Sequence, residues 1–364
     1  GAHSLQYGKT DAYVESAEVV LADGTVTTFG AVELETIREE ADPDPDAGDL
    51  LPRIYEAVRR VVDEHGDEIV EAYPDMKRNV SGYNLDRLVA EAAGGIGPTG
   101  EDVGEAGTVN LARLLAGSEG TLGIVTEATL ALEPIPETKS VALLAYEDLV
   151  TAMEDVEPIL EHDPAAVEVL DDVLLDLARD TEEFGALVTD VVPEGAGAVL
   201  LVEFYAEDDA EGREQTADLL ADRLPTAEAA PQATPPAPVR TAAEVRSFAG
   251  FEAHDEAERD RFWTLRKSGL PILLSRTTDA KHISFIEDCA VPPKHLAEYV
   301  ERFEAILEKH GTFASFYAHA GPGVLHVRPL IDTKTLDGVE QLVGIADAVT
   351  DVVTELGGSV SGEH

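Results

Sequence analysis

Two histidines on either side of a short turn are the sharpest chemical feature of the sequence. His319 and His326 flank a Gly-Pro-Gly turn. If the chain folds back there as a hairpin, residues 319 and 326 lie opposite one another, with Cβ atoms about 5 Å apart. Imidazole nitrogens bind zinc and similar divalent ions. If the carboxylate of Glu363 were the third ligand, one coordination position of the ion would stay open for a substrate. The alternative is that both histidines only hydrogen-bond within the turn, and the spacing alone does not separate the two interpretations.

Two basic side chains are candidates for binding a carboxylate. Arg266 lies in the run 262–267, where the aromatic and aliphatic residues predict a buried helix that turns the guanidinium inward. A guanidinium can grip a carboxylate through two hydrogen bonds. Lys281 begins the alternating run 281–285, which is typical of a strand. For both residues the alternative is a surface cation that pairs with nearby acids or reaches solvent.

A glycine-dense segment at residues 117–126 is a candidate for close approach to a ligand. It lacks the Gly-x-Gly-x-x-Gly spacing of dinucleotide sites and the lysine of a P-loop. Glycine tolerates positive φ and has no Cβ, so successive amides can point at a flat ring or a diphosphate. The alternative is an ordinary glycine-rich connection. A Gly-x-Ser-x-Gly elbow is absent from the sequence, so acyl transfer has no support.

The predicted elements that must position these residues indicate an α+β fold. The first part begins with a hairpin of strands 17–21 and 25–29 around Asp23-Gly24, and continues with helices 50–64 and 85–93 and strand 128–132. Pro134 and Pro136 then mark a domain boundary. The second part is predicted to contain strands 140–145, 198–205 and 283–290, the hairpin 313–327, and helices 149–160, 210–224, 294–309 and 336–356. We expect these helices to cover one sheet face, and a flexible surface insertion near 225–240.

The charge balance indicates a high-salt habitat. The sequence has 73 acidic and 26 basic residues, a net charge of −47 spread along the whole chain. Nucleic acid is therefore an unsuitable partner. Such self-repulsion destabilises a compact state in dilute buffer, whereas molar salt, with a Debye length of about 3 Å, screens it. The alternative is an ordinary acidic protein.

The apolar stretches and the cysteine content indicate where in the cell the protein is expected and which sites it lacks. Uninterrupted apolar stretches stay short of the roughly 20 residues that span a bilayer, so no transmembrane segment is expected. The first residues lack the pattern of a signal peptide, which predicts a cytoplasmic protein. Cys289 is the only cysteine, so internal disulfides, cysteine-based zinc sites and iron–sulfur clusters are not expected within these residues.

Three segments together resemble one enzyme family: Gly117–Thr126, the His319–His326 hairpin and the closing Gly358–His364. They are similar to the flavin-linked oxidases related to vanillyl-alcohol oxidase and p-cresol methylhydroxylase. The branch in question includes D-lactate, glycolate and D-2-hydroxyglutarate dehydrogenases. The resemblance implies that residues 1–135 are the second half of an FAD-binding α+β domain. Residues 136–364 would form a ferredoxin-like antiparallel-sheet substrate (cap) domain covered by helices.

The resemblance also implies roles for individual residues. His319, His326 and Glu363 would bind a divalent metal, zinc or similar. Arg266 and Lys281 would hold the substrate carboxylate. His364 would be the general base that takes the hydroxyl proton while the α-hydrogen leaves as hydride to the flavin. The residues that would contact FAD are Ser4, Gly8, Thr10, Gly117, Glu119, Gly120, Gly123, Ile124 and Val125.

The implied activity is FAD-dependent oxidation of a D-2-hydroxy acid of the D-lactate, glycolate or D-2-hydroxyglutarate class. Residues 285–292 and 325–329 are most similar to the subclass fused to an iron–sulfur domain, which would lie downstream, so an iron–sulfur domain or another electron-transfer partner is expected. A peripheral position at the inner face of the cell membrane stays open. One departure from the family is Arg328, which stands where many relatives have asparagine.

Because the first half of the FAD domain would be missing, we expect residues 1–364 alone to be inactive. Two other functions remain open at this point. One is the related flavin-dependent alkyl transfer of ether-lipid synthases. The other is a non-catalytic metal-binding module, in which His319 and His326 take up metal without any dependence on flavin.

Overall fold

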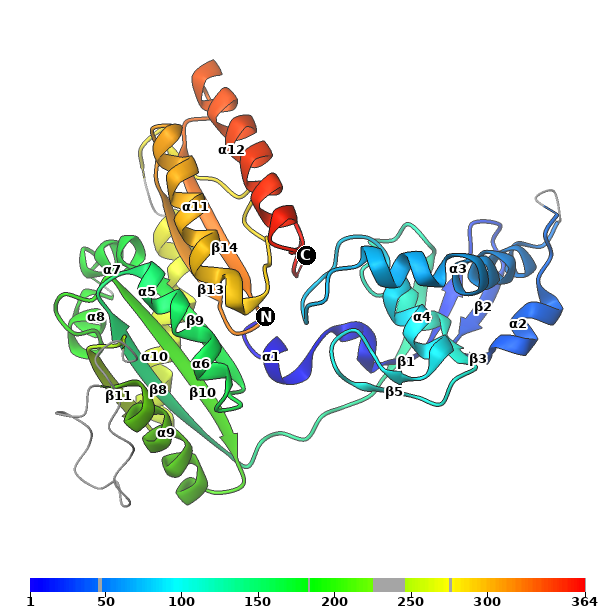
Figure 1. Ribbon diagram of the computed structural model, residues 1–364, viewed down its shortest axis with the longest axis horizontal. Helices are drawn as coiled ribbons and strands as arrows, with labels where there is room; N and C mark the ends of the chain where they lie inside the picture. The colour runs from blue at the N-terminus through cyan, green and yellow to red at the C-terminus, as the bar shows by residue number, and fades with distance from the viewer. Residues whose placement is uncertain (45–47, 183, 225–245, 275–276, 364) are drawn as a thin grey trace. The chain divides into compact units, whose positions relative to one another are not determined.

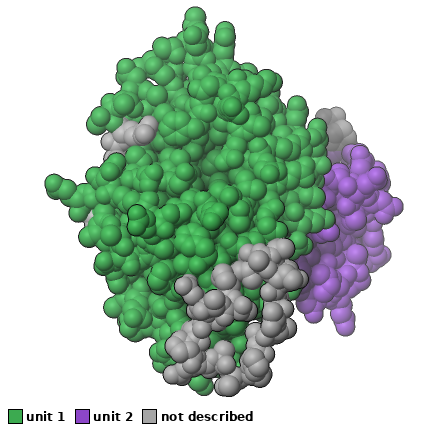
Figure 2. All heavy atoms as spheres, turned by 60° about the vertical axis from the view of Figure 1, so that its left-hand side comes forward, with its two compact units in different colours: residues 1–7, 135–363 green, residues 8–134, 364 purple. Residues whose placement is uncertain are grey.

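The computed structural model describes residues 1–44, 48–182, 184–224, 246–274 and 277–363. They form two compact units, drawn in different colours in Figure 2: residues 8–134, and residues 135–363 together with residues 1–7. The insertion predicted near 225–240 and the proposed base His364 lie outside the described residues.

The unit of residues 8–134 combines short strands with helices. Its elements are η1 (Thr10–Tyr13), β1 (Val14–Val20), β2 (Val26–Phe29), β3 (Ala31–Glu33), α2 (Leu34–Glu40), α3 (Leu50–Ala72), α4 (Leu85–Ala93), β4 (Gly95–Ile96), β5 (Asp102–Gly104), β6 (Thr108–Asn110), η2 (Leu111–Leu115) and β7 (Ile124–Leu130). The predicted hairpin is confirmed, because β1 and β2 pair antiparallel around Asp23-Gly24. Strand β7 pairs with the other side of β1, and every residue of β7 is exposed in the described structure.

The second unit is built on one large sheet. Its elements are α1 (Ser4–Tyr7), β8 (Thr138–Tyr146), α5 (Leu149–Glu154), α6 (Val156–Leu160), β9 (Ala166–Asp171), α7 (Asp172–Arg179), α8 (Gly185–Val191), β10 (Ala198–Ala206), α9 (Asp209–Arg223), β11 (Ala249–Ala253), α10 (Glu256–Leu274), β12 (Lys281–His282), η3 (Pro293–His295), α11 (Leu296–Lys309), β13 (Ala314–His319), β14 (Val324–Ile331) and α12 (Leu336–Glu355).

The predicted ferredoxin-like antiparallel sheet is confirmed. The seven strands lie in the order β11-β8-β10-β9-β13-β14-β12, and all their pairings are antiparallel. If β8, β9, β10 and β11 are numbered 1 to 4 along the chain, their spatial order β11-β8-β10-β9 is 4-1-3-2, the order of a ferredoxin-like sheet. The hairpin of β13 and β14 extends this sheet beyond β9, next to α11 and α12 (Figure 1).

The expectation that helices cover one sheet face is wrong, since they cover both. The even-numbered residues 142–146 of β8 pack in one apolar core with α5, α6, α9, α11 and α12. The odd-numbered residues 141–145 pack in a second core with α7, α8 and α10. The cause is visible in β8, whose residues 140–146 are all buried, because a strand that is apolar on both faces needs cover on both.

Two further predictions differ from the structure. The predicted helix 149–160 is two helices, α5 and α6, separated by Asp155, whose buried carboxylate accepts hydrogen bonds from Tyr146 and Arg223. The predicted strand 283–290 is wrong. Only Lys281 and His282 pair with β14, and residues 283–289 form an irregular segment, followed by a bridge at Ala290.

Among the residues that the structure describes, we find no helix with the length and apolar character needed to cross a membrane.

Candidate metal and substrate site

The hairpin of β13 and β14 places two imidazoles on one face of the sheet. His319 pairs with Val324, and His326 pairs with Tyr317. The prediction that residues 319 and 326 lie directly opposite is therefore wrong by two residues, because the turn spans residues 320–323 and is closed by a hydrogen bond from the Gly323 amide to the Ala320 carbonyl. The histidines are diagonal neighbours instead, and their ring centroids lie 5.1 Å apart.

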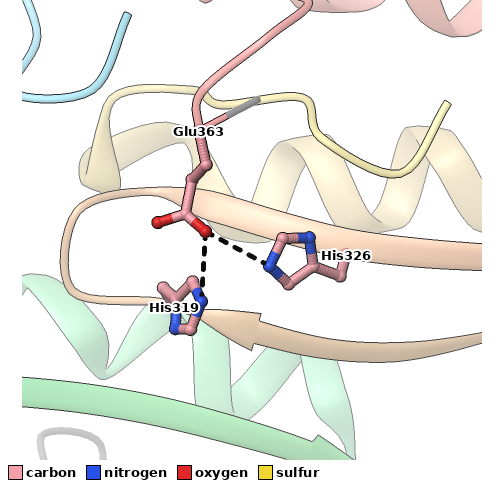
Figure 3. A group of neighbouring side chains, drawn as sticks. All are labelled: His319, His326 and Glu363. Carbon is pink, nitrogen blue, oxygen red and sulfur yellow. Dashed lines mark ion pairs between the residues drawn. The ribbon is translucent and has the colours of Figure 1, made fainter. Parts of the chain in front are cut away.

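Glu363 completes the group. Its Oε2 lies 3.3 Å from Nε2 of His319 and 3.6 Å from Nε2 of His326. Figure 3 shows the carboxylate pointing between the two rings, which come from the two strands of the hairpin. One ligand atom from each residue lies within 4.8 Å of the others. The three residues that the sequence predicts as metal ligands are thus brought together.

The other ring nitrogen of each histidine is already engaged. Nδ1 of His319 lies 2.8 and 2.9 Å from the two carboxylate oxygens of Glu168, and Nδ1 of His326 lies 2.9 Å from the carbonyl oxygen of Glu287. Carboxylate and carbonyl oxygens accept hydrogen bonds, so Nδ1 carries the proton in both rings. The lone pair for a metal is then on Nε2, the nitrogen that faces Glu363.

The charges of the group interact strongly. Burial raises the pKa of Glu363, but contacts with His319 and His326 outweigh it and lower this pKa well below the usual range. Burial lowers the pKa of His326, but contacts with Glu287 and Glu363 outweigh it and raise this pKa to about 9. A histidine must be neutral to bind a metal, so metal binding here would displace a proton.

A pocket of about 540 Å³ adjoins the histidines. His319, Glu168 and Arg266 line it, together with the cations Lys139, Arg259 and Lys267. Arg266 comes from α10 and is buried as predicted; its Nε donates a 2.7 Å hydrogen bond to Glu168. The pocket is lined by four basic and four acidic residues, the acids being Glu168, Glu203, Glu256 and Asp260, so binding of an anion would depend on individual cations such as Arg266 and not on the overall charge of the pocket.

Lys281 is not among the residues that line this pocket. It begins β12, where it pairs with Ile331, five residues beyond His326 on β14. The geometry therefore connects Arg266 to the histidines through Glu168, but it does not bring Lys281 into the same pocket among the described residues.

The candidate FAD contacts fall in both units. Gly8, Thr10 and the segment 117–125 belong to the unit of residues 8–134, whereas Ser4 is a buried residue of α1 in the other unit. Gly117, Glu119 and Gly120 have φ of 80°, 51° and 75°. A Cβ at either glycine would meet nothing within 4 Å, so this loop presents its backbone to open space. Such a surface fits a flat ring or a diphosphate.

Three acidic residues of the site, Glu168, Glu287 and Asp288, were not predicted from the sequence. Glu168 belongs to β9, a strand that was not predicted, although a lone glutamate inside the apolar run Ala166–Leu170 is a signal that could have identified it. Glu287 and Asp288 lie in the segment predicted as a strand. Oδ2 of Asp288 accepts hydrogen bonds from Oγ of Ser361 at 2.8 Å and from the amide of Glu363 at 3.1 Å.

Residues 135–364 match the family model described as FAD linked oxidases, C-terminal domain. D-2-hydroxyglutarate dehydrogenase of Pantoea ananatis is 30% identical over all of this chain and 33% of its own length. The enzyme of that name from Escherichia coli is also 30% identical, with 100% of this chain and 33% of its own length covered. The glycolate oxidase subunit GlcD of Bacillus subtilis is 32% identical over 70% of this chain and 48% of its own length.

The chain therefore spans about a third of the length of the D-2-hydroxyglutarate dehydrogenases that it matches. Among solved structures, p-cresol methylhydroxylase aligns with a TM-score of 0.49 and 11% identity, over 98% of this chain and 59% of that chain.

Proposed function

The chain belongs to the FAD-linked oxidases, and we propose from this membership that the whole protein oxidises a D-2-hydroxy acid to the 2-oxo acid. One observation carries the proposal: two imidazoles and one carboxylate converge within 4.8 Å beside a pocket that Arg266 lines. The names of the relatives, D-2-hydroxyglutarate dehydrogenase, glycolate oxidase subunit and D-lactate dehydrogenase, supply the candidate substrates.

The donor set fits a divalent metal. Two imidazole Nε2 atoms and one carboxylate oxygen suit zinc or a similar ion and leave a position for a substrate oxygen. His319, His326 and Glu363 would hold the ion. When bound, it would polarise the substrate hydroxyl and help to orient the acid.

The chain's own residues would bind the acid and move its hydroxyl proton. Arg266 uses Nε for Glu168, and its Nη2 lies 3.5 Å from Nδ1 of His319; its terminal nitrogens would bind the substrate carboxylate at the pocket wall. We assign Lys281 to the same carboxylate as a second cation, which requires it to reach the substrate from β12, outside the residues that line this pocket. His364, which directly follows Glu363 in the sequence, would take the hydroxyl proton as general base.

FAD would supply the acceptor for the hydride. The glycine segment supports this assignment, because Gly117 and Gly120 hold positive φ on an exposed loop where a Cβ would meet open space. We assign the FAD contacts to this segment, to Gly8 and Thr10, and to Ser4. For the reduced flavin we propose an iron–sulfur domain or a separate electron-transfer protein as the acceptor, and we place the protein in the cytoplasm or peripherally at the inner face of the membrane.

The test is dye-linked oxidation of a panel of D- and L-2-hydroxy acids by the full-length gene product in high salt, with and without a chelator. We expect one D-acid to be oxidised and the chelator to suppress its turnover. Turnover that a chelator leaves unchanged would contradict the metal assignment alone. A full flavin complement with no turnover of any acid would contradict the dehydrogenase proposal and favour flavin-dependent alkyl transfer or a non-catalytic metal module.

A further inference from the structure

Each of the three candidate metal ligands is held by an acidic residue of its own. We propose that Glu168, Glu287 and Asp288 are positioning residues that fix His319, His326 and Glu363, respectively, in the arrangement that binds the metal. This inference rests on the metal site of the proposed function. The three acids are themselves outside the ligand group and would not touch the ion.

Glu168 holds His319 from the neighbouring strand. The two residues are register partners of β9 and β13, and the Glu168 carboxylate is fully buried. The same carboxylate accepts a 2.7 Å hydrogen bond from Nε of Arg266, so it is held between the arginine and the histidine. A buried ion pair contributes little stability by itself, because desolvation offsets its attraction. We therefore infer that Glu168 serves to fix the tautomer and the ring orientation of His319.

Glu287 holds His326 mainly through its backbone carbonyl, with its carboxylate farther away. Its carbonyl oxygen lies 2.9 Å and its Oε2 3.4 Å from Nδ1 of His326. The carboxylate in turn accepts a 3.1 Å hydrogen bond from Arg328. Arg328, at the position of the departure from the family pattern, also donates to Ser284 and to the hydroxyl of Tyr317.

Each histidine thus contacts a glutamate that in turn contacts an arginine, and we call each such chain of contacts a support. The first support is Arg266, Glu168 and His319, and the second is Arg328, Glu287 and His326. The guanidinium carbons of Arg266 and Arg328 lie 5.2 and 5.6 Å from the ring centroid of Tyr317, which separates the two supports. Because both arginines contact one buried ring, neither support can shift without disturbing the packing of the other.

Asp288 holds the segment that carries Glu363. Its Oδ2 accepts hydrogen bonds from Oγ of Ser361 and from the amides of Gly362 and Glu363, at 2.8, 3.1 and 3.1 Å. Gly362 has no room for a side chain, since a Cβ would lie 2.9 Å from Val324 and 3.0 Å from Ala290. Irregular backbone at 283–289 lets Glu287 and Asp288, adjacent in sequence, serve two different ligands.

The test measures Zn²⁺ affinity in the full-length protein, by competition with a chromophoric chelator. We compare wild type with Glu168→Gln and Asp288→Asn, and we use the absorption spectrum of bound Co²⁺ to report ligand geometry. Removing such supporting groups weakens metal binding by roughly 10- to 100-fold in comparable sites. We expect a loss of that size in both variants and an altered Co²⁺ spectrum.

The matched control is Asp155→Asn. Asp155 is also buried and paired with an arginine, at 2.9 Å from Arg223, but it contacts none of the three ligands in the described structure. We expect it to lower stability and leave Zn²⁺ affinity unchanged. If wild type binds no Zn²⁺, the metal site itself fails. If wild type binds and Glu168→Gln and Asp288→Asn bind equally well, or if Asp155→Asn weakens binding as much, the positioning roles are wrong while the metal site stands. Should Glu168→Gln not fold, Asp288→Asn decides.

Discussion

Glu168 and His319 are separated by 150 residues in the sequence and are direct partners across β9 and β13, with both carboxylate oxygens within 2.9 Å of Nδ1. Backbone pairing therefore fixes the pair, and the orientation of His319 does not depend on a loop. A site built on strands is held more precisely than one built on loops. The ligand group should consequently tolerate removal of one member without loss of the fold.

The first prediction concerns the two histidines. We expect His319→Ala and His326→Ala each to abolish metal uptake at stoichiometric metal, because the two remaining protein ligands bind the ion too weakly to replace its water ligands. The FAD content of the full-length protein should stay unchanged. Metal analysis and the flavin absorption spectrum measure both quantities. His295→Ala is the control, since His295 lies in η3 beside Glu298, away from the group. Full metal content in either variant would contradict the ligand assignment.

The second prediction concerns the turn between the histidines. Gly323 has φ +84°, and a Cβ there would lie 2.0 Å from the carbonyl oxygen of Val291. We expect Gly323→Ala to cost more than about 3 kcal/mol, because it adds a clash to the roughly 1–2 kcal/mol of the left-handed conformation, and to weaken metal binding.

Gly195→Ala is the matched control for this substitution. Gly195 has a similar φ of +87° in the same unit, but nothing lies within 4 Å of its Cβ position. We expect only the conformational cost of about 1–2 kcal/mol and normal metal binding. Denaturant unfolding and Zn²⁺ titration measure the two effects, and equal losses in the two variants would show that close packing of the turn is unimportant.

The local parts of the fold and site could be predicted from the sequence. The hairpin at Asp23-Gly24 follows from turn chemistry, and the helix that carries Arg266 follows from its apolar spacing. His319 and His326 are close in sequence, so their meeting needs only a turn. Glu363 was named as their partner, but its place beside them depends on the long-range packing of the closing segment on residues 288–290.

The parts that depend on non-local pairing could not be predicted in this way. Nothing within residues 166–171 indicates that β9 lies beside β13, and only that neighbour relation brings Glu168 to His319. The alternating run 283–290 predicted a strand, but its polar residues Glu287 and Asp288 bond to site residues in place of a ladder. The alternating pattern of residues 283–290 gives a wrong prediction because the conformation of this segment is set by its bonds to the metal-site residues and not by pairing with a neighbouring strand.

The third prediction is a pH dependence of stability. Burial raises the pKa of Asp171 to about 7, although amides of Phe316 and Leu174 bond to it and lower this pKa in part. Between about pH 4 and pH 7 the folded state then binds more protons at this site than the unfolded state does. Stability from this residue is therefore present at low pH and is lost as the pH rises through 7.

Asp171→Asn isolates this contribution, because asparagine keeps an oxygen for the amide of Leu174 and cannot titrate. We expect the free energy of unfolding of wild type, relative to the variant, to fall by on the order of a few kcal/mol between pH 4 and pH 7. Denaturant titrations at both pH values in the same salt measure the difference. Parallel pH profiles for the two proteins would contradict the assignment.

The last prediction concerns salt. With a net charge of −47, the folded protein is destabilised by self-repulsion that a Debye length of about 10 Å at 0.1 M salt leaves largely unscreened. We expect the thermal midpoint of unfolding to be higher in 2 M KCl than in 0.1 M KCl. The double variant Asp67→Asn/Glu71→Gln removes two exposed acids one turn apart on α3, a like-charge pair whose repulsion is about 0.2–0.5 kcal/mol. It should stabilise the protein in 0.1 M KCl and have no effect in 2 M KCl, where the charges are screened. A thermal midpoint of the wild type that is equal at both salt concentrations would favour an ordinary acidic protein. A stabilisation by the double variant that persists in 2 M KCl would show that these substitutions do not act through charge repulsion.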